Sequence, residues 1–203
     1  MLKRPVAMAR ARHEAGLSLV EILIAVAVMG LVTGIGGLTV RTLLPTLRAD
    51  AALQQTLIQL RQARTMSINQ RRNFTVTFQG TKELVVVRQE VPPAGVPPPV
   101  PAVTTSIADT SLPGGMVYMV FAGTPDTPDG FGNAQALNFC PTSGACSISL
   151  VFQSDGSVLA NGKVVNGTVF MGIPGNAKTA RAVTVMGATG RMHGYRCNGA
   201  AWF

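Results

Sequence analysis

The chain has 203 residues and a formal net charge of +8, and charged residues make up only 13% of it. This length predicts one domain with an appendage, and a mean hydropathy of +0.31 is high for a wholly soluble protein. The moderate positive charge favours anionic surfaces without establishing a nucleic-acid partner. The odd number of cysteines, Cys140, Cys146 and Cys197, excludes a fully paired intramolecular set.

The N-terminal part predicts a basic leader followed by a long apolar helix. Four basic residues gather in the first twelve positions: Lys3, Arg4, Arg10 and Arg12. Residues 17–40 then carry a single charge, Glu21. As a helix they would extend about 36 Å, enough to cross a hydrocarbon core of roughly 30 Å. We therefore expect a single-pass protein of the bacterial inner membrane, with residues 1–16 in the cytoplasm and a C-terminal head in the periplasm.

Two simpler interpretations of this segment compete. A secretory signal peptide has a shorter apolar region that ends in a small-x-small cleavage site, which is not found here. A generic single-span anchor of a periplasmic protein fits the length of residues 17–40 but gives Glu21 no purpose. A charge within an apolar span costs a few kcal/mol and is by default a functional hypothesis.

The stretch "GLSLVE" at residues 16–21 resembles the prepilin peptidase site of type IV pilins and type II secretion pseudopilins, with Leu17 in place of the usual Phe. The resemblance implies cleavage after Gly16, N-methylation of Leu17 and a role for Glu21 in filament assembly. The new amine at Leu17 would be neutralised by Glu21 of a neighbouring subunit in a low-dielectric filament core. The implied partners are other pilins or pseudopilins, the prepilin peptidase, the inner-membrane assembly platform and the inner membrane itself.

The helical pattern continues through residues 41–72 as an amphipathic half that packs onto a head. One face is predicted from apolar or small residues three or four apart: Leu43, Leu47, Leu53, Leu57, Leu60, Ala63 and Ser67. Pro45 is expected to kink this helix rather than end it. Arginines outnumber the one acid, Asp50, so residues 41–72 present either a solvated face or an anion-binding surface.

After residue 73 the apolar period changes to two, which predicts strands. A hairpin is expected from residues 74–78 and 84–88, followed by a proline-rich loop or break at 91–103. Further strands are predicted at 116–121, 147–152, 157–160, 168–173, 181–186 and 190–196. A helix followed by antiparallel strands is α+β, so we expect a pilin-like fold with a β-rich head over residues 73–203.

The C-terminal half resembles the GspH/FimT family of pseudopilins and minor pilins. The matching residues are Phe152, Asp155 and Gly156 in one turn and Gly190 with Arg191 before the last strand. The resemblance implies a non-catalytic subunit of a type II secretion pseudopilus or a type IV pilus.

A DNA-binding minor pilin for natural transformation is the alternative function. FimT-type proteins carry a Gly-Arg-x-Arg motif, and here residues 190–193 read Gly-Arg-Met-His. Basic groups interleaved with aromatics are typical of single-strand platforms. The candidates are Lys178, Arg181, Arg191, His193, Tyr195 and Arg196, with Trp202 as a further stacking residue. The competing interpretation is a final strand with solvated arginines and core-capping aromatics.

No motif for an enzyme is found, and we expect no cofactor, metal or small-molecule substrate. Asp126 and Asp129 lie in a Gly-rich stretch that suits either calcium or, more simply, a turn, because two carboxylates fall short of the ligands Ca²⁺ needs. In an oxidising periplasm a disulfide between Cys140 and Cys146 is favoured, and the alternatives join Cys197 to one of the two.

Overall fold

The computed structural model describes residues 18–90, 104–141 and 145–203, apart from the side chains of residues 34–42 and 104. The predicted leader at 1–16, Leu17 and the proline-rich segment at 91–103 lie outside the described residues. The chain divides into two compact units, Met1–Thr42 and Leu43–Phe203, which are described separately below.

A single helix, α1 (Leu19–Gln70), begins close to the predicted position. The Ser18 carbonyl accepts the amides of Glu21 and Ile22 and so starts the helix. Pro45 lies inside α1, which confirms that it does not end the helix. After Gln70 the chain turns at Arg71, whose φ of 50° is left-handed, and the Arg72 amide donates to the Ser67 carbonyl at 3.2 Å.

In the first unit, the described part of α1 is apolar and exposed on every side. Leu19, Leu23 and Val26 have exposed fractions of 77%, 63% and 63%. Among the residues that the structure describes, no helical stretch is both long and apolar enough to cross a membrane. The predicted span at 17–40 extends past them, because Leu17 and the side chains of residues 34–40 are not described.

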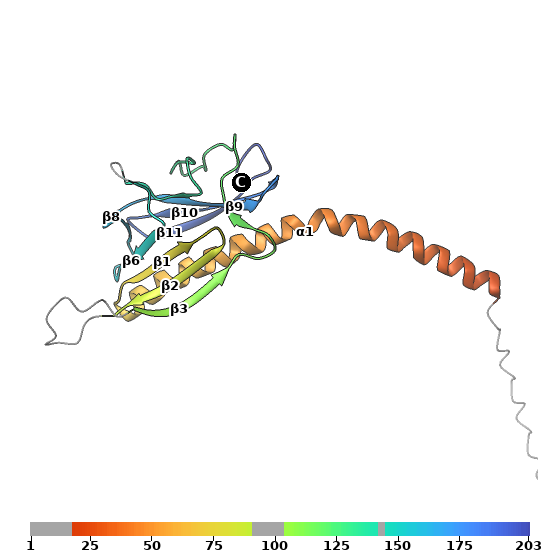
Figure 1. Cartoon of the computed structure of the whole chain (residues 1–203), viewed down its shortest axis with the longest axis horizontal. Coiled ribbons are helices and arrows are strands. Elements are labelled where there is room, and N and C mark those ends of the chain that lie inside the picture. The colour runs from red at the N-terminus through yellow and green to blue at the C-terminus, as the bar shows by residue number, and fades with distance from the viewer. Residues whose placement is uncertain (1–17, 91–103, 142–144) are drawn as a thin grey trace, which may run out of the picture. The chain divides into compact units, whose positions relative to one another are not determined.

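The second unit contains two antiparallel sheets (Figure 1). The first sheet has the order β3-β2-β1-β6-β7-β8, built from β1 (Phe74–Gln79), β2 (Glu83–Gln89), β3 (Thr104–Ser111), β6 (Ser149–Phe152), β7 (Val158–Ala160) and β8 (Lys163–Val164). The second sheet has the order β11-β10-β9-β4, and β5 also pairs with β9. Its strands are β4 (Val117–Tyr118), β5 (Leu137–Asn138), β9 (Gly167–Ile173), β10 (Asn176–Met186) and β11 (Arg191–Arg196).

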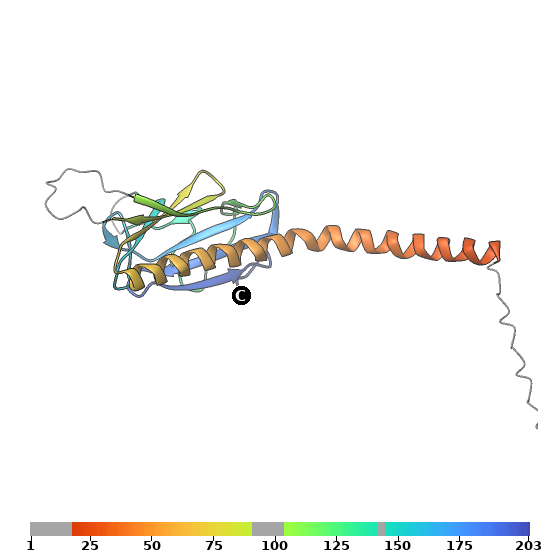
Figure 2. The same ribbon diagram turned by 90° about the horizontal axis from the view of Figure 1, so that it is seen from below.

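The core of this unit lies between the second half of α1 and the two sheets, along which the helix runs (Figures 1 and 2). The helix contributes Leu53, Leu57 and Leu60, and the strands contribute side chains such as Phe74 and Val183. The helix approaches β11 closely at Gly194, where an added Cβ would lie 2.7 Å from Leu57 Cδ1 and 3.2 Å from Leu53 Cδ1. A side chain at this position would force the Leu57 side chain to move.

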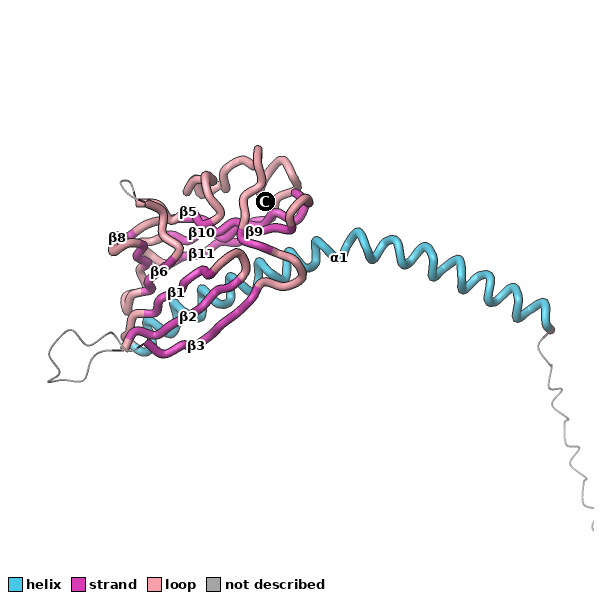
Figure 3. The backbone as a smooth tube through the Cα atoms, in the orientation of Figure 1, coloured by secondary structure: helices cyan, strands magenta, loops and turns pink. Residues whose placement is uncertain are grey.

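The predicted α+β class is confirmed, but three details of the prediction were wrong. Leu43 and Leu47, assigned to the packing face, have exposed fractions of 54% and 61%. The predicted strand at 116–121 shortens to β4, because the chain leaves β9 at Met119 and enters a long loop (Figure 3). Three strands, β3, β5 and β8, were not predicted: two have only two residues and β3 is a polar edge strand without an apolar alternation.

Candidate functional site

The only described residue of the predicted processing and assembly site is Glu21, because Gly16 and Leu17 lie outside the described part. Glu21 lies in the first turn of α1 and is exposed, between the exposed apolar side chains of Val20 and Ile22. It forms no ion pair with any described residue.

The second candidate region, the basic C-terminal segment, is divided between the two faces of the second sheet. In the β10–β11 register Arg181 lies opposite Arg196, and Thr184 lies opposite His193. Directly opposite residues share a face and neighbours along a strand alternate. Arg181 and Arg196 therefore lie on the face that packs on α1, and Arg191, His193 and Tyr195 lie on the outer face.

On the helix-facing side, two arginines share one carboxylate of α1. Asp50 Oδ1 lies 2.8 Å from Arg181 Nε and 3.1 Å from Arg196 Nε. Arg181 is only 4% exposed, and its Nη1 also donates to the carbonyls of Lys178 and Ala180. This corrects the expectation that Arg181 belongs to an exposed binding platform, because its charge is buried and already paired. Lys178 and Arg196 remain exposed.

On the outer face, several side chains converge on Asp129 of the loop between β4 and β5. Asp129 Oδ2 accepts a short hydrogen bond from the Thr184 hydroxyl and a second from Tyr195 Oη at 3.1 Å. His193 Nδ1 lies 3.4 Å from the same oxygen. Partial burial favours the neutral form of Asp129, but these hydroxyls and His193 together outweigh it and lower its pKa. His193 and Tyr195 thus hold a loop rather than form an open stacking platform.

The same loop is fixed at a second point by the C-terminal segment. Trp202 Nε1 donates to the Pro125 carbonyl at 2.8 Å, and the indole ring lies 5.8 Å from the Phe170 ring. The carboxylate of Asp126 accepts the amides of Thr127 and Gly132, both at 2.7 Å, so it builds the turn itself. Within the described residues no group of three acidic, histidine or cysteine side chains is placed to hold a metal ion.

The two turns that carry the GspH/FimT resemblance meet over α1. The Asp155 carboxylate caps its turn by accepting the Ser157 amide at 2.8 Å. Gly190 has a φ of 63°, and an added Cβ would overlap the Gly156 carbonyl and approach Arg64 Nε. Arg64 Nε donates to that Gly156 carbonyl at 3.3 Å. The motif therefore has a packing role, and the sequence pattern offered no signal that Arg64 takes part in it.

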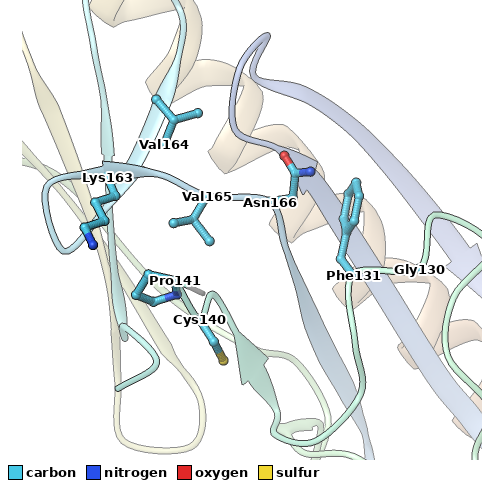
Figure 4. Close-up of a pocket in the computed structure, with 8 residues that line it drawn as sticks. All are labelled: Gly130, Phe131, Cys140, Pro141, Lys163, Val164, Val165 and Asn166. Atoms are coloured by element: carbon cyan, nitrogen blue, oxygen red, sulfur yellow. The ribbon is translucent and has the colours of Figure 1, made fainter. Parts of the chain in front are cut away.

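Cys140 lines a surface pocket of about 430 Å³ in the head. Cys140 and Cys146 are joined by a disulfide, and Cys197 is free and buried. Figure 4 shows Pro141 next to Val165, with Lys163 and Cys140 also among the residues that line the pocket. Sequence analysis gave no indication of the pocket, because its walls come from segments far apart in the chain.

Comparison with known proteins supports the N-terminal assignment. Residues 11–37 match the family model described as the prokaryotic N-terminal methylation motif. This match confirms the resemblance to type IV pilins and pseudopilins at the segment from which it was inferred, and the chain is a protein with a prepilin-type N-terminus and an α+β head. A similar solved structure is the type IV minor pilin FimU of Pseudomonas aeruginosa strain PAO1. It is 12% identical, with a TM-score of 0.46 over 76% of this chain and 90% of that one. No curated protein matches the chain.

Proposed function

We propose that the chain is a non-catalytic minor pilin or pseudopilin subunit of a type IV pilus or a type II secretion pseudopilus. The observation that carries the proposal is the methylation motif at residues 11–37, with one exposed carboxylate, Glu21, in an otherwise apolar helical surface. The apolar segment holds the precursor in the inner membrane with the head in the periplasm, and the same surface packs against other subunits after extraction.

Processing creates the charge that Glu21 needs. The prepilin peptidase cuts after Gly16, and the new amine of Leu17 is methylated. In the filament this cation pairs with Glu21 of a neighbouring subunit, which sets the axial register of the two helices. The assembly platform of the inner membrane and the other pilins are the partners that this cycle requires.

The N-terminus of the mature protein tests the proposal. Mass spectrometry of the chain, expressed with and without a prepilin peptidase, should find N-methylated Leu17 only when the peptidase is present. A generic membrane anchor keeps Met1 or residues close to it in both cultures. An unmodified N-terminus in the presence of an active peptidase would contradict the proposed processing.

DNA binding is a second candidate, supported by the exposure of Lys178 and Arg191. Because Arg191 and Arg196 lie on opposite faces of the sheet, one DNA segment cannot use both as a single strip. We therefore expect Arg191→Ala to weaken DNA binding of the full chain. The slope of log K against log salt concentration should fall by about one, the value for one lost phosphate contact. Arg196→Ala serves as the matched control from the other face. Equal losses in both variants, or binding that ignores salt, would contradict this interpretation.

A further inference from the structure

Asparagine is followed by glycine at three places in the head: Asn161–Gly162, Asn166–Gly167 and Asn198–Gly199. In such a pair the glycine nitrogen can attack the side-chain carbonyl of the asparagine. The missing Cβ leaves the approach open, and glycine adopts the backbone conformations that the attack requires. The fold places the three pairs in different surroundings, so their reactivities should differ.

Two of the pairs are held by their neighbours. The side-chain oxygen Oδ1 of Asn166 accepts the Gly187 amide at 2.8 Å, and Gly167 is buried in β9 against Phe139, with no room for a Cβ. Asn198 accepts the amides of Ala200 and Ala201, both at 2.9 Å. The attacking nitrogen of its partner is also engaged, because the Gly199 amide donates to Cys197 Sγ at 3.3 Å.

Among the described residues, Asn161 and Gly162 are held by one side-chain contact, from Asn161 Nδ2 to the Ala145 carbonyl at 2.9 Å. They form the two-residue turn between β7 and β8, with φ values of 51° and 75°, and both are exposed. Within the described residues the Gly162 amide donates no hydrogen bond. The strand that follows, β8, has two exposed residues and pairs only with β7 at the edge of the first sheet. Opening this turn therefore disturbs little structure and costs little free energy.

We propose that Asn161 is a site of spontaneous deamidation in the folded protein. The Gly162 nitrogen attacks Asn161 Cγ and forms a C–N bond, and the Cγ–Nδ2 bond breaks. The amide proton of Gly162 leaves with the side-chain NH₂ as ammonia, and the product is a succinimide. Water then adds to one of the two imide carbonyls, and the bond from that carbon to the Gly162 nitrogen breaks. Attack at Cγ gives aspartate, and attack at the backbone carbonyl carbon gives isoaspartate. No oxidation or reduction takes place.

The modification alters the surroundings of the disulfide and the pocket. Asn161 Nδ2 donates to the Ala145 carbonyl at 2.9 Å, next to Cys146. A carboxylate has no proton to donate to a carbonyl, so this contact is lost on deamidation. The new negative charge lies two residues from Lys163, which lines the pocket together with Cys140 (Figure 4). Deamidation therefore loosens the attachment at Ala145 and reduces the positive charge at the pocket wall.

The test is to incubate the purified full chain in detergent at mildly alkaline pH and to follow isoaspartate at the three sites by peptide mapping. Asn166 and Asn198 are matched internal controls, because all three asparagines precede glycine. We expect Asn161 to react at least about tenfold faster than either, since its turn opens at lower cost. In urea, where the fold no longer protects any pair, the three rates should converge.

Two results would overturn the proposal. Either Asn166 or Asn198 reacts as fast as Asn161 in the folded chain, or Asn161 stays intact while the unfolded chain reacts. The structural consequence has its own test in Asn161→Asp, which mimics one product. This variant should speed hydrogen exchange at Cys146 relative to the wild type, and an unchanged rate would contradict the loosening inferred at Ala145.

Discussion

At the scale of single residues, Asp129 is the polar group that ties the β4–β5 loop to the second sheet. Its carboxylate accepts hydrogen bonds from Thr184 and Tyr195, and the pKa of Asp129 is lowered below its ordinary value of 3.8. A group with a lowered pKa stabilises the fold above its unfolded value, and this contribution disappears as the pH falls through the folded value. The loop attachment should therefore weaken only in acid.

Asp129→Ala should lower the free energy of unfolding by about 1–2 kcal/mol at neutral pH, because the buried Thr184 hydroxyl and the half-buried Tyr195 hydroxyl lose their acceptor. The difference in free energy of unfolding between the variant and the wild type should shrink below about pH 4, because the Asp129 carboxyl of the wild type becomes protonated. Urea unfolding of the full chain in detergent over a range of pH measures this, and the exposed Asp109→Ala is the control. A difference that stays constant into acid would show that the charge on Asp129 is not what holds the loop.

At the scale of elements, Asp50 connects α1 to the second sheet through Arg181 and Arg196. The side chain of Arg181 is 5% exposed and that of Arg196 is 47% exposed, so the two pairs differ in energy. Removing the acid leaves a buried guanidinium without its counter-charge, whereas removing the exposed arginine leaves a carboxylate that is still paired.

We expect Asp50→Ala to lower the free energy of unfolding by about 2–4 kcal/mol, and Arg196→Ala by less than about 1 kcal/mol. Urea unfolding of both variants in the full chain measures the contrast. Equal losses would mean that the buried pair with Arg181 does not hold the helix on the sheet.

Sequence patterns predicted the elements in which apolar residues recur at regular spacing. The hairpin of β1 and β2 alternates apolar and polar residues, and α1 from Leu53 onward repeats its apolar residues every three or four positions, so both were found. The exposure of Leu47 was not predictable, because helical periodicity cannot say where the head begins along the helix. The separation of Arg191 from Arg196 follows from strand alternation, but only once the register is known. The Asp129 cluster joins residues far apart in the chain and left no local signal.

At the scale of the whole molecule, the chain combines a helix segment with an exposed apolar surface and a head with its own buried core. The head is held together by its own hydrophobic core. The apolar surface of the first unit contains one carboxylate, Glu21, within the residues matched by the methylation motif. This motif, together with the exposed apolar surface around Glu21, is why we propose assembly as the function of the protein.

The incorporation of Glu21 variants into filaments tests this central claim most directly. The full chain is expressed with its filament system, and the amount in the sheared or sedimented filament fraction is compared with the amount in the membrane. We expect Glu21→Ala to be processed and membrane-bound but depleted from filaments about tenfold or more, because the methylated amine of a neighbour loses its counter-charge. The matched control Val20→Ala, which keeps the carboxylate, should assemble like the wild type. Incorporation of Glu21→Ala at the wild-type level would contradict the account.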